Sequence, residues 1–382
     1  MTRILEKMSL LGLSLLLISA FSISTALPPM LDYYSPTFSA AQVELLVSVP
    51  SFSVVAMLLL NSFIDKWLSD RQLIVTGLLL LSSAGIFPFF VQAYPLVLLS
   101  RIAFGMGIGL INAKAIAIIS QRYQGKERVQ MLGIRGSMEL IGGASCSLLV
   151  GQLLKIHWTF AFLIYGFGFV ILIMYLLFVP SMEQVEKKQI TKRKQVLNKK
   201  DLGMILGMAL LAGFVICINS SISLRVPLFQ VAGKTIESGQ SALVLSLEQG
   251  IGIVAGLSFA SLIGHFKNRL LLIVMFLLAV CLFGMSVASN LPILILSSVG
   301  VGFFYSIILT IIFNRLSESI ARSLLNKATA YVLLGWSAIS PYVLKLLALI
   351  SPSFSWIFLA YAIVSFLLFL GFFLNAKMAK KV

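Results

Sequence analysis

The chain has 382 residues, of which 59% are apolar and only 11% are charged, and its mean hydropathy is +1.03. A soluble protein of this length and composition would have too few polar groups to cover its surface. The net charge of +16 would suggest a nucleic-acid partner in a soluble chain. Here the basic residues are scattered over many short segments without interleaved aromatic residues, which argues against nucleic acid. We therefore expect a protein embedded in a lipid bilayer.

Twelve apolar segments are each long enough to cross a membrane, because a hydrocarbon core of roughly 30 Å needs about 20 residues of helix. The first follows Arg3 and Lys7 as a signal peptide would, but its length and the eleven later segments indicate a retained helix. The sequence therefore predicts an all-α membrane protein with twelve transmembrane helices. The predicted spans are 8–29, 41–63, 72–93, 95–120, 130–153, 158–180, 202–224, 241–263, 270–289, 292–313, 328–350 and 355–375.

One long polar run, SMEQVEKKQITKRKQVLNKKD at 181–201, separates two apolar stretches of similar length. We expect it to be a cytoplasmic linker loop. It divides the chain into an N-terminal six-helix bundle over 1–180 and a C-terminal six-helix bundle over 202–382.

The basic residues are distributed unequally between the two sides of the predicted membrane. With the N-terminus in the cytoplasm, the inner segments hold 22 Lys and Arg residues and the outer loops hold three. Such a bias is the positive-inside rule. It predicts a multi-pass protein of the cell membrane, with both termini and the linker in the cytoplasm.

The second half repeats landmarks of the first, as an internal duplication would. Ser22-Ile-Ser and Ser221-Ile-Ser each precede a proline and stand 199 residues apart. The fourth and tenth spans open with Pro95 and Pro292, 197 residues apart, and the sixth and twelfth open near Trp158 and Trp356, 198 residues apart. Six crossings return the chain to its starting side, so the halves are parallel repeats about an axis along the membrane normal, an arrangement that encloses a cavity near the midplane.

The fourth span carries Arg101-Ile-Ala-Phe-Gly-Met-Gly, which resembles the Arg-x-x-x-Gly-x-Gly pattern of the major facilitator superfamily. The resemblance covers nearly the whole chain and implies two pseudo-twofold-related bundles, alternating access, and a role for Arg101 in proton coupling. In the loop after the second span, Asp65 and Lys66 match the family's gating loop, while Asn61 and Leu68 replace its glycines. This resemblance implies a cytoplasmic gate formed by Asp65, Lys66 and Arg128.

The fifth span resembles part of an exporter motif of the same family. Gly133 and Gly142 are in step with its first two glycines, but Gly143 and Cys146 replace the following Pro and the last Gly. Ala26-Leu-Pro resembles the end of a first-helix motif of twelve-helix drug/proton antiporters, with Ser19 in place of its Asp. The nearest resemblance is therefore to antiporter-like members.

Ionisable side chains inside a span are costly and are functional candidates. At 1.5 Å per residue, Lys114, Arg135 and Glu139 lie at similar heights, and Arg135 and Glu139 share a helical face. We hypothesise that Glu139 or Glu248 binds a transported proton that Arg101 or Arg135 expels in one state; a fixed ion cluster that only orients helices is the alternative. Lys345 lies near the outer end and is expected to reach the interface. The six buried candidates are Arg101, Lys114, Arg135, Glu139, Glu248 and Lys345.

The sequence has no nucleotide-binding loop, nucleophile elbow or His/Glu metal spacing, and its three cysteines read as packing residues. We therefore expect neither an enzyme nor a metal site, and no cofactor besides a proton gradient. The predicted function is proton-coupled export of small amphipathic molecules by a monomer. The alternatives are a symporter or exchanger for a small organic anion, and a sensor that does not transport. The predicted substrate cavity is lined by Ser22, Asn112, Asn219, Gln249, Tyr305 and Trp336.

Overall fold

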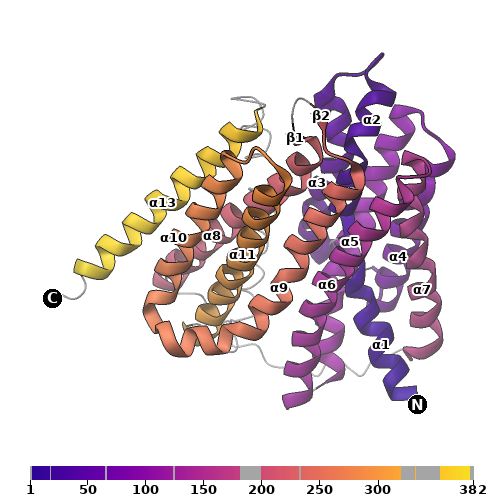
Figure 1. Cartoon of the computed structure of the whole chain (residues 1–382). Coiled ribbons are helices and arrows are strands. Elements are labelled where there is room, and N and C mark those ends of the chain that lie inside the picture. Colours follow the sequence, from indigo (N-terminus) through magenta and orange to yellow (C-terminus); the bar gives the residue numbers. More distant parts are fainter. Residues whose placement is uncertain are drawn as a thin grey trace.

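The computed structural model describes residues 2–17, 19–64, 67–123, 125–180, 199–231, 234–319, 332 and 353–378. This part of the chain is almost entirely helical (Figure 1), and the predicted all-α fold is confirmed. The described residues add one feature that the sequence did not predict, a hairpin of two-residue strands, β1 (Gln230–Val231) and β2 (Lys234–Thr235).

The elements before the predicted linker, which we call the N-terminal half, are α1 (Thr2–Leu15), η1 (Ser19–Ala26), α2 (Leu27–Tyr34), α3 (Ala40–Ile64), α4 (Asp70–Phe90), α5 (Tyr94–Arg122), α6 (Gly125–Leu153), η2 (Trp158–Gly166) and α7 (Phe167–Phe178). The helices of the C-terminal half are α8 (Lys199–Arg225), η3 (Val226–Leu228), α9 (Ser238–Phe266), η4 (Lys267–Arg269), α10 (Leu270–Ser286), α11 (Leu291–Ser319) and α13 (Phe354–Met378).

Within the described residues, eight helical segments are long and apolar enough to cross a membrane, and each coincides with a predicted span. The predicted ninth span is the shorter apolar helix α10, and the fifth is α6, which carries the charged Arg135 and Glu139. The eleventh, 328–350, lies outside the described residues except for Val332.

The first predicted span, 8–29, is not one continuous α-helix. The α-helix ends at Leu15, and a 3₁₀ segment occupies Ser19–Ala26 before α2 begins with a proline in its first turn. Serine and threonine hydroxyls compete for backbone groups and weaken an α-helix. Thr25 Oγ1 donates a hydrogen bond to the Ser22 carbonyl at 3.3 Å, so the polar cluster in this span favours the tighter turn.

Corresponding helices of the two halves pack through corresponding glycines. A Cβ at Gly105 of α5 would lie 2.4 Å from the carbonyl oxygen of Pro50 in α3, and a Cβ at Gly302 of α11 would lie 2.2 Å from that of Glu248 in α9. Both pairs need glycine because the backbones touch. These contacts match the repeat inferred from the sequence. The α5–α3 contact in the N-terminal half corresponds to the α11–α9 contact in the C-terminal half, and a glycine allows the close approach in both.

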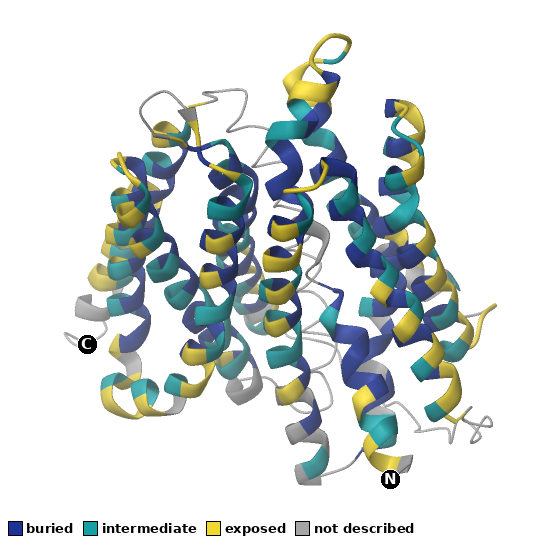
Figure 2. Ribbon diagram, turned by 45° about the vertical axis from the view of Figure 1, so that its right-hand side comes forward, coloured by how far each residue is buried: buried dark blue, intermediate teal, exposed yellow. Residues whose placement is uncertain are grey.

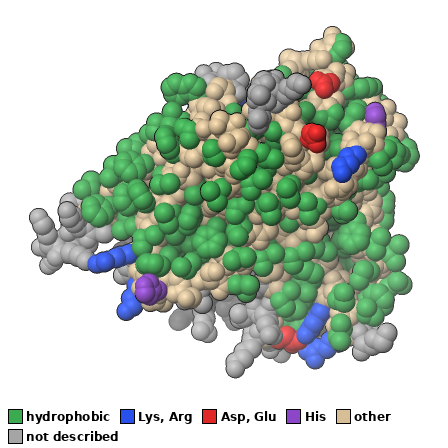
Figure 3. All heavy atoms as spheres, in the orientation of Figure 1, with side chains coloured by type: hydrophobic (Ala, Val, Ile, Leu, Met, Phe, Trp, Pro, Cys, Tyr) green, Lys and Arg blue, Asp and Glu red, His purple; other side chains and the backbone are tan. Residues whose placement is uncertain are grey.

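The described apolar residues form one large buried cluster in each half, and a few residues such as Leu224 cross between them. Buried positions face the interior of each half, and exposed positions lie on the outer helix surfaces (Figure 2). Those surfaces are hydrophobic across the flank of the molecule, with charged side chains at the upper and lower edges (Figure 3). Leu177, Leu257 and Leu296 are at least 70% exposed, as lipid-facing side chains are.

Candidate functional site

The two halves meet along α6 and α9, which lie side by side (Figure 1). Ser246 Oγ of α9 donates a hydrogen bond to the Ala144 carbonyl of α6 at 2.9 Å. Farther along, a Cβ at Gly252 of α9 would lie 3.2 Å from the side chain of Leu140. This α6–α9 interface therefore brings the charged part of α6 close to the middle of α9.

The α6 side of the interface carries an ion pair. Arg135 Nη2 donates to Glu139 Oε1 at 2.6 Å and to Asn112 Oδ1 of α5 at 3.4 Å. The Arg135 and Glu139 side chains are 11% and 22% exposed. The predicted pairing of these two residues on one helical face is confirmed, and Asn112, predicted to line the cavity, contacts the same guanidinium.

The α9 side carries a second carboxylate, Glu248, one turn before Gly252. Glu248 is 2% exposed, and its Oε2 has no hydrogen-bond partner among the described residues. The neighbouring helix α11, which carries Tyr305, packs against this part of α9, since a Cβ at Gly252 would lie 2.7 Å from Ser306 Oγ. The two carboxylates therefore lie on the two helices, α6 and α9, that meet between the halves.

Lys114, expected beside Arg135 and Glu139, instead forms an ion pair with Asp70 at 2.8 Å. Asp70 lies in the first turn of α4, where the helix dipole favours a negative charge. The flexible lysine stem lets the ammonium reach that end of the helix. Lys114 is 6% exposed.

The Arg101 side chain is enclosed within the N-terminal half. It is 1% exposed, and its Nε donates to the Leu46 carbonyl of α3 at 3.1 Å. Its guanidinium lies 4.4 Å from the ring centroid of Phe104, 5.8 Å from that of Phe162 and 5.6 Å from that of Tyr165. The Leu46 carbonyl and the three aromatic rings, which we call the aromatic box, all belong to the N-terminal half.

The other predicted cavity residues differ in their surroundings. Ser22 is fully buried and accepts a long hydrogen bond from Ser147 of α6 at 3.5 Å. Asn219 Oδ1 and Gln249 Oε1 are buried without a hydrogen-bond partner in the described part of the chain. Trp336 lies outside the described residues, as does the charged Lys345.

The predicted cytoplasmic gate falls mostly on residues that the structure does not describe. Asp65 and Lys66 lie outside them, as does the side chain of Arg128 in α6. The neighbouring Glu127 accepts hydrogen bonds from Arg3 at 2.9 Å and lies 2.7 Å from the ammonium of Lys7. The hydrogen bond from Lys7 is the main cause that lowers the pKa of Glu127.

An ion pair between the halves was missed by the sequence analysis. Arg225, at the end of α8, donates from Nη1 and Nη2 to the two carboxylate oxygens of Glu44, near the start of α3, at 2.9 and 3.2 Å. One signal was available, because Arg225 is one of the three basic residues on the side that the positive-inside rule depletes. Further contacts between the halves, η1 with η3 and α2 with η3, join the same ends of the two halves, opposite the N-terminus. The positive-inside bias predicts that this is the outer end.

Several solved structures of known proteins share this fold. The crystal structure of a D-xylose–proton symporter superimposes with a TM-score of 0.78 at 13% identity over 97% of each chain. The inward-open xylose transporter XylE from E. coli gives 0.76 at 14% identity, over 98% of this chain and 96% of that one. An inward-facing bacterial homologue of the human lysosomal transporter Spinster gives 0.70 at 15% identity, over 97% and 95%.

These identities establish a shared fold and no more. The search of curated proteins gave no match. The sequence model described as Major Facilitator Superfamily matches residues 9–337, most of the chain. The protein is thus an integral membrane protein and belongs to the Major Facilitator Superfamily.

Proposed function

We propose that this member of a family of secondary transporters is proton-coupled, works by alternating access, and exports small amphipathic molecules in exchange for protons. The observation that carries the proposal is the pair of buried carboxylates, Glu139 on α6 and Glu248 on α9, on the two helices that pack together where the halves meet. Rocking one half against the other changes the surroundings of both groups at once. Such a change is what coupling a proton to a conformational cycle requires.

The two carboxylates differ in their partners, as a cycle of proton binding and release requires. Glu139 forms an ion pair with Arg135 at 2.6 Å, whereas Glu248 has a buried oxygen without a hydrogen-bond partner among the described residues. An ionised carboxylate without a partner is costly there, so Glu248 holds a proton in this state. Movement of α9 relative to α6 then exposes Glu248 to another partner and releases the proton. The D-xylose–proton symporter shares this fold, which supports proton coupling here.

The basic residues that could bind an anion already contact other groups of the protein. This favours a cationic or neutral substrate over an organic anion. The anion alternative relied on Arg101, Lys114 and Arg135, but these contact an aromatic box, Asp70 and Glu139. The buried groups without a partner in the described residues include three acceptors, Glu248 Oε2, Asn219 Oδ1 and Gln249 Oε1. Hydroxyl or ammonium donors on an amphipathic molecule would satisfy them.

The coupling test uses the purified protein in proteoliposomes with a pH-sensitive dye inside. Glu248→Gln and Glu139→Gln each remove an ionisable proton site, and we expect proton movement driven by substrate to fall at least about tenfold in at least one of them. Glu237→Gln is the matched control, because Glu237 lies on the same helix α9 as Glu248 but is exposed at its N-cap. Coupling equal to the wild type in both carboxylate variants would contradict the proposal.

Direction and substrate class need a separate experiment. Expression in a drug-sensitive host should raise resistance to chemically unrelated amphipathic cations, and everted vesicles should accumulate them when the interior is acidified. A growth requirement for one nutrient anion would favour the symporter alternative. If no compound equilibrates with a pH gradient while the protein remains folded, the sensor alternative holds.

A further inference from the structure

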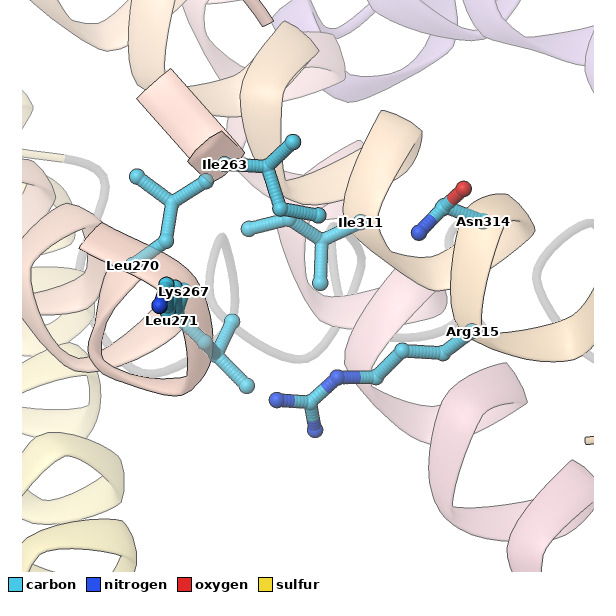
Figure 4. A pocket seen from close by; sticks show the side chains of 7 residues that line it. All are labelled: Ile263, Lys267, Leu270, Leu271, Ile311, Asn314 and Arg315. Carbon is cyan, nitrogen blue, oxygen red and sulfur yellow. The ribbon is translucent and has the colours of Figure 1, made fainter. Parts of the chain in front are cut away.

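A pocket of about 260 Å³ lies at the inner end of the C-terminal half, where α9 ends, α10 begins and α11 ends (Figure 4). One wall is apolar and the rim is polar and basic. The lining residues are Ile263, Lys267, Leu270, Leu271, Ile311, Asn314 and Arg315.

The rim carries two cations that no acid neutralises within the described residues. Neither Lys267 nor Arg315 forms an ion pair or hydrogen bond with a described residue, and both side chains are exposed. They come from different elements, η4 and α11. Figure 4 shows the Arg315 guanidinium extending from α11 toward Leu271 of α10. Two cations without an acidic partner in the described part of the chain form a suitable site for a phosphate oxygen.

The backbone at Lys267 is strained. Its φ is 47° and its ψ is −128°, and it is the one residue other than glycine with positive φ in the described part of the chain. Residues other than glycine rarely adopt such a conformation, and it tends to persist at ligand sites. It ends α9 and directs the next turn into α10, whose N-terminus has no side-chain cap. The positive end of the α10 dipole therefore adds to the two cations at the pocket.

We propose that this pocket binds the phosphate of an anionic phospholipid from the leaflet on the N-terminal side, which the positive-inside bias predicts to be the cytoplasmic leaflet. The charged rim recognises the phosphate and excludes zwitterionic lipids, whose own ammonium opposes the two cations. The apolar wall of Ile263, Leu271 and Ile311 contacts the start of an acyl chain. Free inorganic phosphate lacks that chain and uses only half of the site.

The experiment measures lipid retention by native mass spectrometry, and thermal stability in detergent, on the full-length protein. The probes are phosphatidylglycerol, phosphatidylcholine and inorganic phosphate. Phosphatidylglycerol should be retained and raise the melting temperature, whereas the other two should have little effect. The double variant Lys267→Gln, Arg315→Gln should bind phosphatidylglycerol roughly thirtyfold more weakly, because each removed cation weakens binding about fivefold.

The charge-matched control is Arg269→Gln with Lys155→Gln. Arg269 lies in the same η4 turn but does not line the pocket, and Lys155 is exposed at the other membrane face. This control should bind phosphatidylglycerol as the wild type does. Lys267→Gly removes the ammonium while relieving the backbone strain, so it gives a folded test if the double variant misfolds. Phosphatidylglycerol binding unchanged in Lys267→Gly and Arg315→Gln, or equal protection by inorganic phosphate, would overturn the proposal.

Discussion

Arg101 is a fully buried cation that packs against aromatic rings. Three aromatic rings and the Leu46 carbonyl surround its guanidinium. Arginine is suited to such a box because its planar, weakly hydrated group stacks on rings and donates in fixed directions. The ammonium of lysine is compact and strongly hydrated, so it would lose both the stacking and the bond from Nε. The family resemblance implies a role in proton coupling, and the box gives an independent reason for arginine here.

Arg101→Lys should therefore lower stability by about 1–3 kcal/mol, the combined effect of lost cation–π contacts and a buried carbonyl without its donor. Thermal unfolding in detergent measures the change. Transport by the same variant separates the two roles. A melting temperature equal to the wild type together with lost proton coupling would assign Arg101 to coupling and contradict the packing argument.

At the scale of elements, Gly142 controls how closely α6 approaches α1. A Cβ at this position would lie 2.0 Å from the Leu15 carbonyl oxygen, at the point where α1 ends. Gly142 belongs to the part of the exporter motif that the sequence retains. The close contact with α1 supplies a physical reason for glycine at this position. Because the obstacle is backbone, no side-chain rotation relieves the clash.

Gly142→Ala should destabilise the protein by about 1–3 kcal/mol, the usual cost of forcing added atoms into a packed interface. Gly136→Ala is the control on the same helix, since a Cβ there meets no atom within 4 Å, and alanine favours a helix by about 1 kcal/mol over glycine. Unfolding of both variants in detergent provides the comparison. If the two melt at the same temperature, the α1–α6 contact is not as tight as the structure shows.

The spans and the Arg135–Glu139 pair were predictable because both depend on local geometry. Apolar length predicts a crossing, and a spacing of four places two side chains on one helical face. The partner of Lys114 depends on how α4 packs against α5, and the Glu44–Arg225 pair depends on how the halves meet. A single sequence contains no direct record of such packing. The 3₁₀ segment after Leu15 was predictable only in part. The cluster of serine and threonine residues indicates a weakened α-helix there but does not give the position at which the helix ends.

For the whole molecule, the Glu44–Arg225 pair bears on which side of the membrane is closed. It joins the halves through a bidentate contact, and its side chains are only 22% and 12% exposed. The short helix η3 joins the halves at the same end, where it contacts η1 and α2 of the N-terminal half. Under the proposed alternating access, with the N-terminus in the cytoplasm, opening the cavity at this outer end breaks the ion pair. The pair should therefore stabilise the outer-closed state and not the outer-open one.

Glu44→Gln should weaken the outer-closed state by about 1–3 kcal/mol, the value of a hydrogen-bonded charge pair of this kind, and shift the equilibrium toward the outer-open state. Spin labels at Ser35 and Asn290, exposed outer positions in opposite halves, would report a larger population of long distances once the three native cysteines are replaced. The exchanged pair, Glu44→Arg with Arg225→Glu, should restore the short distances because the attraction is rebuilt with reversed sign. Distances that stay unchanged in Glu44→Gln would mean that apolar packing along α6 and α9 alone holds the outer side closed.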